Sequence, residues 1–183
     1  MSQAIALLRG INVSGKNKIR MADLKALFAS LGCNPVATYL QSGNVVFGSS
    51  KAISASSIER AIKDQMGLDV PVLTLAPPEL AAIFQNNPFL NKDGVDPTHC
   101  YVTFLWETPS KTLVSELELP NNETGSFSIS GKYVYVHCPN GYGRSKIHNG
   151  FFEKKFDQLA TTRNWKTVNA LLAMSAQSGE SGP

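Results

Sequence analysis

A β-hairpin is predicted by the stretch Val36-Ala-Thr-Tyr-Leu-Gln-Ser-Gly-Asn-Val-Val-Phe47, which decides the fold. Two runs rich in apolar, β-branched and aromatic residues, 36–40 and 44–47, flank Gln41-Ser42-Gly43. A glycine between two such runs is typical of a tight turn that joins antiparallel strands. We therefore place the neighbouring elements around this pair of strands.

One strand and one helix are predicted before the hairpin, and one helix and one strand after it. Residues 4–9 form a short apolar run, and apolar residues recur at helical spacing over 24–31. Beyond the hairpin, the same spacing over 58–66 predicts a second helix, and the β-branched run 70–75 predicts a fourth strand. The order βαββαβ is that of a ferredoxin-like module.

The second half of the chain repeats this order in outline, after a short helix that begins at Pro77-Pro78. A strand, a helix, a hairpin and a further helix are predicted over 99–106, 109–117, 126–138 and 145–159. Thr161 or Thr162 is interpreted as the cap of a final helix. The last strand of the repeat is therefore not predicted.

The fold class is α+β, with two ferredoxin-like modules, the second incomplete, and a C-terminal helix. The boundary between the modules is placed in 91–98, where glycine and proline interrupt the pattern. The predicted domains are residues 1–90 and 91–174. The polar segment 175–183 is expected to be a disordered tail.

The composition indicates a globular protein of the cytoplasm. Apolar residues make up 43% of the chain and charged residues 17%, which excludes extensive disorder. The sequence has no apolar run long enough to cross a bilayer and no signal-peptide pattern at its start, so a membrane is not an expected partner. Three cysteines without Cys-x-x-Cys spacing fit reduced thiols better than disulfides.

The net charge of +3 is unevenly distributed along the chain. Segments 5–25 and 140–170 each carry an excess of four positive charges, so the remainder is acidic. Such asymmetry indicates a positive face that binds an anion. The alternative is that the two segments lie apart and are merely solvated.

The loop after the first strand, Gly10-Ile-Asn-Val-Ser-Gly-Lys-Asn17, nearly matches the phosphate-binding pattern Gly-x-x-x-x-Gly-Lys-Ser/Thr. Asn17 replaces the hydroxyl that holds magnesium, and the helix begins only after Lys18-Ile-Arg20, so a nucleotide triphosphatase is not predicted. A metal-free anion site remains open, because glycines let backbone N–H groups converge on phosphate. The alternative is an ordinary loop between a strand and a helix.

A second glycine-rich stretch, Asn140-Gly-Tyr-Gly-Arg-Ser-Lys146, leads into the helix predicted over 145–159. Ser145 is expected to cap this helix, so that its free N–H groups, Arg144 and Lys146 face an anion. Arg163 is a candidate bidentate clamp for a phosphate or carboxylate. For the stretch 140–146 the alternative is a capped helix with solvated charges.

Two further patterns carry less weight. Tyr133, Tyr135 and His137 share one face of the strand on which RNA-recognition modules carry stacking aromatic residues, but cross-strand packing explains them as well. The dipeptides His99-Cys100 and His137-Cys138 place too few ligands on one face for tetrahedral zinc, so no metal or other cofactor is predicted. The sequence contains none of the common catalytic motifs, and its catalytic residues, if it has any, stay unknown.

Three segments together resemble the domain-of-unknown-function family 1697, small proteins found mainly in bacteria. They are Leu8-Arg-Gly-Ile-Asn-Val-Ser-Gly-Lys-Asn-Lys-Ile-Arg-Met21, Tyr39-Leu-Gln-Ser-Gly-Asn-Val-Val-Phe47, and Gly143-Arg-Ser-Lys146 with Thr162-Arg-Asn-Trp-Lys-Thr-Val168. The chain departs from the family pattern at Ser14, where glycine is usual, and at Ile147-His148-Asn149, where Leu-Thr-Asn is typical. The resemblance implies an α+β fold of two ferredoxin-like halves. It points to no particular activity, because the family has none securely assigned.

The leading hypothesis is a binding module in which a basic groove between the two modules holds a phosphate-containing ligand, either a nucleic acid or a nucleotide. One alternative is an enzyme that acts on a small phosphorylated substrate there, with Tyr142, Ser145 or His148 as the proton-transfer groups. The other is a structural or partner-binding protein. The predicted ligand-binding residues are Arg9, Gly10, Asn12, Gly15, Lys16, Lys18, Gln41, Ser42, Asn44, Gly143, Arg144, Ser145, Lys146, Arg163 and Asn164.

Overall fold

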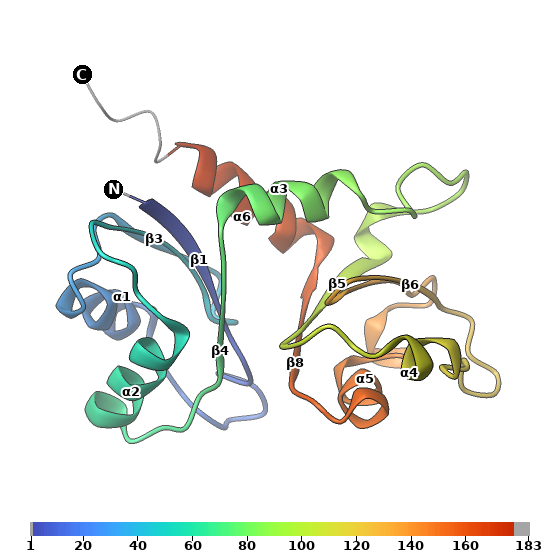
Figure 1. The fold of residues 1–183 in the computed structure, drawn as a ribbon, viewed down its shortest axis with the longest axis horizontal. Helices are drawn as coiled ribbons and strands as arrows, with labels where there is room; N and C mark the ends of the chain where they lie inside the picture. Colours follow the sequence, from blue (N-terminus) through green and yellow to red (C-terminus); the bar gives the residue numbers. More distant parts are fainter. Residues whose placement is uncertain (1, 178–183) are drawn as a thin grey trace. The chain divides into compact units, whose positions relative to one another are not determined.

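The computed structural model describes residues 2–177 and confirms the α+β fold class, with two four-stranded antiparallel sheets (Figure 1). The chain forms two compact units, which are residues 2–82 with 169–177, and Ile83–Val168. The division falls within α3 (Pro77–Gln85) and within α6 (Trp165–Gln177), whereas the sequence suggested a boundary near residue 90. Each unit is described separately below.

The first unit has the order βαββαβ that the sequence around the hairpin predicts. Its elements are β1 (Ser2–Leu8), α1 (Met21–Ser30), β2 (Val36–Tyr39), β3 (Asn44–Ser49), α2 (Ala55–Met66) and β4 (Val72–Leu75). The strands lie in the order β2-β3-β1-β4, and each neighbouring pair is antiparallel. The long loop after β1 and the β2–β3 turn leave the sheet at the same end, because Leu7 pairs with Asn44.

The apolar faces of α1 and α2 cover one side of this sheet (Figure 1). Leu24 and Phe28 of α1 and Ile58 and Ile62 of α2 are fully buried there. Phe28 packs on Phe47 of β3 with ring centroids 5.1 Å apart. The helical spacing seen in the sequence thus marks the buried face, as expected for helices that pack on a sheet.

The second unit repeats the same order completely, so the prediction that its last strand is missing was wrong. Its elements are β5 (Cys100–Leu105), α4 (Lys111–Ser115), β6 (Ser126–Ser130), β7 (Tyr133–His137), α5 (Asn149–Phe156) and β8 (Ala160–Asn164). The strand order β6-β7-β5-β8 matches that of the first unit. The strand β8 was missed because Ala-Thr-Thr-Arg-Asn has no aliphatic run and resembles a helix cap.

Both C-terminal helices begin later than predicted. The helix α5 begins at Asn149, so Ser145 does not cap it, and a separate short 3-10 turn, η2 (Tyr142–Arg144), precedes it. The helix α6 begins at Trp165, and Asn164 caps it by accepting a hydrogen bond from the Thr167 N–H at 2.8 Å. A 3-10 turn, η1 (Pro97–His99), also precedes β5.

The predicted tail 175–183 is contradicted over its first three residues, which belong to α6. Ser175 is buried and its hydroxyl donates to the Leu172 carbonyl, so the helix continues through this polar segment. Residues 178–183 lie outside the described residues.

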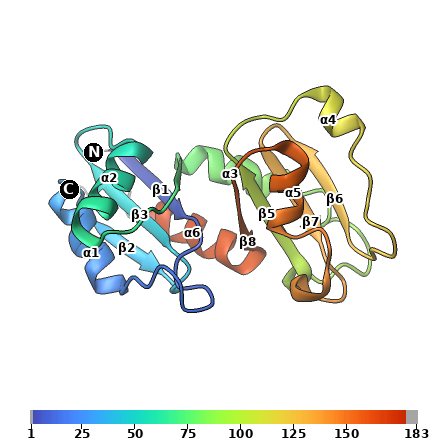
Figure 2. The ribbon, with the colours of Figure 1, turned by 90° about the horizontal axis from the view of Figure 1, so that it is seen from below.

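The core of the second unit lies between its sheet and α5 (Figure 2). Val134, Val136 and Phe152 are fully buried in this core. The opposite face of the sheet carries Tyr135, which is 2% exposed and donates its hydroxyl to the Ile83 carbonyl at 3.0 Å. Tyr135 is therefore a packing residue and is not available to stack on a base.

Candidate ligand-binding sites

The basic loop of the first unit, residues 9–20 between β1 and α1, folds as a small hairpin of its own. Val13 pairs with Lys16 in an isolated antiparallel bridge, and the Lys16 N–H donates to the Val13 carbonyl at 2.9 Å. Ser14 and Gly15 at the corner have φ angles of 49° and 77°. Two consecutive positive φ angles are typical of the tight turns that hairpins favour. The loop is therefore a defined structure and not an irregular connection.

The side chain of Asn12 holds the base of this loop. Its amide nitrogen donates to the Ile19 carbonyl at 2.9 Å and to the Gln41 carbonyl at 2.8 Å. Its amide oxygen accepts from the Ile19 N–H at 2.9 Å. Asn12, predicted as a ligand-binding residue, thus joins the two ends of the basic loop to the β2–β3 turn and has its amide group engaged within the protein.

A pocket of about 520 Å³ lies between the basic loop, the start of α1 and the β2–β3 turn. Its lining residues are Asn12, Gly15, Lys18, Ile19, Arg20, Asp23 and Gln41. Arg20 and Asp23 form a bidentate ion pair at 2.8 and 2.9 Å, whose hydrogen bonds raise the pKa of Arg20 and lower that of Asp23. The structure thus brings four of the predicted binding residues to one pocket.

Two ammonium groups of the basic loop are available to a ligand. The side chains of Lys16 and Lys18 are exposed, and neither forms an ion pair or side-chain hydrogen bond within residues 2–177. Since Arg20 and Asp23 neutralise each other, these lysines give the pocket and its rim a positive charge. Arg9 and Gly10 lie at the start of the same loop, where the Gly10 carbonyl accepts from the Asn17 amide at 3.1 Å.

The β2–β3 turn forms the other side of the pocket, and hydrogen bonds within the turn stabilise it. Asn44 is fully buried, and its amide donates to the Tyr39 carbonyl and to the Ser42 hydroxyl, both at 2.9 Å. Asn44, predicted as a lining residue, is therefore a structural residue of the turn. Gln41 is exposed and lines the pocket.

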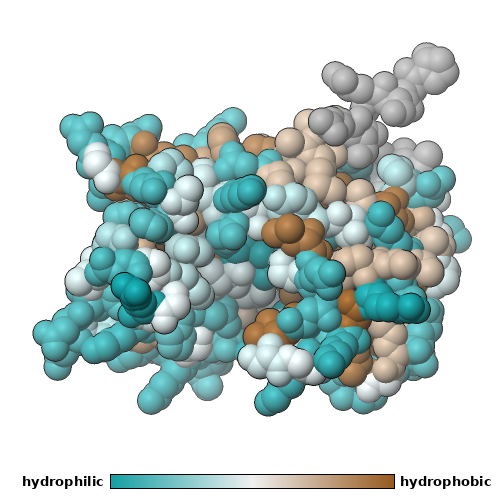
Figure 3. Space-filling view, turned by 180° about the vertical axis from the view of Figure 1, so that it is seen from behind, coloured by the Kyte–Doolittle hydropathy of each residue, from teal (hydrophilic) through white to brown (hydrophobic). Residues whose placement is uncertain are grey.

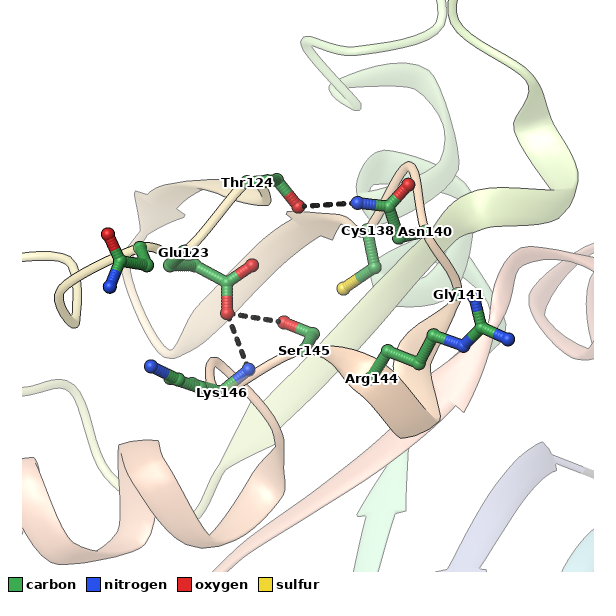
Figure 4. Close-up of a pocket in the computed structure, with 9 residues that line it drawn as sticks. Glu123, Thr124, Cys138, Asn140, Gly141, Arg144, Ser145 and Lys146 are labelled. Atoms are coloured by element: carbon green, nitrogen blue, oxygen red, sulfur yellow. Dashed lines mark hydrogen bonds between the residues drawn. The ribbon is translucent and has the colours of Figure 1, made fainter.

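A second pocket, of about 360 Å³, lies in the second unit around the other glycine-rich stretch (Figure 4). Its lining residues are Asn122, Glu123, Thr124, Cys138, Asn140, Gly141, Arg144, Ser145 and Lys146. Glu123 occupies the position in which an external anion was expected. One of its carboxylate oxygens accepts hydrogen bonds from the Lys146 N–H and the Ser145 hydroxyl, and the other accepts from the Gly125 N–H at 2.6 Å.

The charged form of Glu123 is favoured by this arrangement. Partial burial raises the pKa of its carboxyl group, but hydrogen bonds from Gly125, Lys146, Ser145 and Thr124 outweigh burial, and the pKa is lowered overall. The protein thus fills its own anion site with a carboxylate. Glu123 stands 22 residues before Ser145 in a loop without hydrophobic pattern, and only its position in space reveals this role.

We expect the Glu123 carboxylate to stabilise the protein at neutral pH and to lose this effect in acid. Because the pKa is lower in the folded state than the ordinary value of about 4.3, the contribution is complete above that value and is lost as the pH falls through the folded pKa. The Tm of Glu123→Gln should lie below that of the native protein at pH 7, and the difference should shrink below about pH 4. Calorimetry of both proteins over this range measures the effect, and a constant difference in Tm would contradict it.

The predicted anion-binding groups near Glu123 have different surroundings. The Lys146 ammonium group donates to the Asn121 carbonyl at 2.8 Å. Arg144 is exposed on the Gly141 side of the pocket (Figure 4), and its guanidinium makes no hydrogen bond to any described residue. The φ angle of Gly141 is 86°, a conformation that favours glycine at this position. Gly143 does not have a positive φ angle, so its backbone does not require glycine.

Arg163 does not reach this pocket. It pairs with Val102, which pairs with Tyr135, so its side chain lies on the sheet face opposite the α5 core. The guanidinium is buried and donates to the Thr161 hydroxyl at 2.8 Å and to the Thr162 carbonyl at 2.9 Å. Burial lowers its pKa to about 10, which still leaves it charged at neutral pH.

Of the groups proposed for proton transfer, Tyr142 shows no sign of activation. The Tyr142 hydroxyl accepts from the Asn149 N–H at 2.7 Å, and burial raises its pKa. Burial likewise raises the pKa of the Cys138 thiol, while the lowered pKa of Glu123 makes it a weak base for Ser145. His148 is exposed at the start of α5. An activated hydroxyl or thiol requires a lowered pKa, so Tyr142 and Cys138 do not favour the enzyme alternative.

Within residues 2–177, no three His, Cys, Asp or Glu side chains are grouped so as to hold a metal ion. None of the described helices is both long and apolar enough to cross a membrane. The two basic segments belong to different units, and their convergence on one groove stays a prediction.

The element order and the sheet topology define an α+β protein built from two ferredoxin-like halves. The family model described as "Protein of unknown function (DUF1697)" matches residues 1–135, and the chain belongs to this family, as its sequence predicts. A similar solved structure is that of the conserved bacterial protein SP0830 from Streptococcus pneumoniae. It is 23% identical, with a TM-score of 0.69 over 96% of this chain and 99% of that chain, and at this identity the likeness concerns the fold alone. A comparison with curated proteins found no match.

Proposed function

We propose that the protein binds a phosphate-containing ligand, a nucleic acid or a nucleotide, at the basic loop of its first unit. The observation that carries this proposal is the exposed pair Lys16 and Lys18 beside the pocket of about 520 Å³. Both ammonium groups are free of ion pairs within the described part of the chain, so an anion meets them without breaking an internal contact. The cytoplasmic location inferred from the composition belongs to the same proposal.

The contrast with the second unit supports this choice of site. There the backbone N–H of Lys146 and the Ser145 hydroxyl are taken by Glu123, whose negative charge repels phosphate. In the first unit, the acid that lines the pocket, Asp23, is neutralised by Arg20. Of the two glycine-rich loops, the basic loop is therefore the one open to a phosphate group.

We expect replacement of both lysines to weaken binding strongly. Lys16→Ala with Lys18→Ala should reduce the affinity for a short single-stranded oligonucleotide about tenfold or more at about 50 mM salt, because two phosphate contacts are lost. The slope of log K against log salt should fall by about 0.7 for each lysine removed. Fluorescence anisotropy titrations at several salt concentrations measure both quantities.

Lys51→Ala provides the matched control, since Lys51 is exposed in the same unit but follows the opposite end of β3. It removes one positive charge from the same unit, where the double variant removes two, and should leave the affinity unchanged. Loss of less than about twofold in the double variant, or an equal loss in the control, would remove the basis for this site.

A further inference from the structure

Two exposed aliphatic side chains flank the pocket of the first unit. Val13 is 58% exposed and Leu40 is 56% exposed, more than any other large hydrophobic residue among those that the structure describes. They belong to two different loops, but the Asn12 amide donates to the Gln41 carbonyl, so the chain neighbours of Val13 and Leu40 are hydrogen-bonded to each other. On the molecular face shown in Figure 3, strongly hydrophobic side chains form small groups among hydrophilic ones.

Leu40 is held in an unfavourable backbone conformation. Its φ angle is 54°, in the left-handed region that glycine and asparagine adopt readily but that a bulky side chain rarely adopts. The side chain gains no burial in return, since more than half of it is exposed. A leucine that is both strained and exposed is not explained by folding, whereas contact with a ligand explains it.

The polar groups around these side chains indicate which chemical groups the ligand carries. The Gln41 side chain lines the pocket beside Leu40 and, within residues 2–177, makes no side-chain hydrogen bond. An exposed amide matches the donor and acceptor edges of a nucleobase. Apolar side chains contact the faces of bases, which are accessible only where the bases are not stacked in a duplex. Lys16 and Lys18 on the same loop match the phosphates of the same strand.

We propose that the ligand of this site is single-stranded nucleic acid, whose bases pack on Leu40 and Val13 while Lys16 and Lys18 contact its phosphates. This inference rests on the proposed function and goes beyond it, because it selects a strand with exposed bases over a duplex and over a mononucleotide. The site offers two aliphatic side chains, on separate loops, and two ammonium groups, both on the basic loop. A mononucleotide has one base and would need only part of this set, whereas a strand with several bases and phosphates can contact all four groups.

The test uses Leu40→Asn and Val13→Ser in the full-length protein. Asparagine accepts the left-handed conformation, so Leu40→Asn should keep or raise the Tm while it removes the apolar contact. Its affinity for a labelled single strand of about twelve nucleotides, a typical site size, should fall about fivefold or more, and Val13→Ser should act in the same direction. Binding of inorganic phosphate, which has no base, should not change.

Leu119→Ala is the matched control, because Leu119 is an exposed leucine of the second unit and should have no effect on strand binding. If Leu40→Asn and Val13→Ser bind the strand as the native protein does while the double lysine variant does not, the inference fails and the proposed function stands. Equal affinity of the native protein for duplex and single strand would also overturn it. Binding to vesicles that contain phosphatidylserine, lost in Leu40→Asn and without any binding of oligonucleotides, would assign the site to a lipid surface instead.

Discussion

Gly43→Ala should destabilise the first unit by about 3 kcal/mol, the sum of backbone strain and steric overlap. The φ angle of Gly43 is 77°, where an L side chain costs about 1–2 kcal/mol. A Cβ atom at this position would lie 2.7 Å from the Cβ of Leu8 and 3.0 Å from the Cδ1 of Ile11. The Leu8 N–H donates to the Gly43 carbonyl at 2.8 Å, so the turn cannot move away from β1 without losing that bond. Urea unfolding measures the change in the free energy of unfolding.

Gly67→Ala separates the two contributions. Gly67 ends α2 with a φ of 69°, and a Cβ atom there would have no heavy atom within 4 Å. It should therefore cost only the strain of about 1 kcal/mol. Equal losses for the two variants would show that the close approach of the β2–β3 turn to Leu8 is unimportant. Such a result would also weaken the case that this turn is fixed against the basic loop.

The first unit was predictable because each local pattern agrees with the global fold. The hairpin 36–47 has its glycine at the turn, and the apolar residues of α1 and α2 recur at helical spacing. These signals depend only on neighbours in sequence. For this reason the order βαββαβ and the antiparallel sheet could be anticipated without knowledge of any tertiary contact.

The second unit was predicted less well where tertiary pairing decides the conformation. Residues 160–164 are polar apart from Ala160 and become a strand because they pair with β5 along its length. The role of Glu123 depends on a chain reversal that brings a distant loop beside Lys146. No periodicity marks such a residue, so the sequence predicted an open cradle where the folded protein holds its own carboxylate.

The candidate site of the first unit was located by the sequence, but the role of each of its residues was not. Glycines and lysines between a strand and a helix correctly drew attention to residues 10–18, but residue type does not distinguish a ligand contact from an internal one. Asn12 and Asn44 were both predicted to line the site, and their amide groups are engaged in holding the loops. Leu40 was overlooked because the sequence placed it in the predicted strand 36–40, where a leucine is expected to be buried, and only its backbone angle and exposure single it out.

Asn12→Ala should cost about 4 kcal/mol, the largest effect that we expect for any polar side chain of the basic loop. The variant loses three hydrogen bonds, to the Ile19 carbonyl and N–H and to the Gln41 carbonyl, each with a net value of about 1 kcal/mol. It also places alanine at a φ of 55°, which adds about 1 kcal/mol of strain. Urea unfolding gives the total, and faster hydrogen exchange at the Ile19 amide would report loss of its bond.

Asn17→Ala provides a matched comparison within the same loop. Asn17 also has a positive φ, 46°, but its side chain makes a single exposed hydrogen bond, to the Gly10 carbonyl. The strain is therefore common to both variants, and the difference between them measures what Asn12 adds by joining the loop to the β2–β3 turn. We expect this difference to be about 2 kcal/mol. If the two variants are equally stable, the side chain of Asn12 does not fasten the loop to the turn, and the contact that we infer to hold Val13 beside Leu40 is not a strong one.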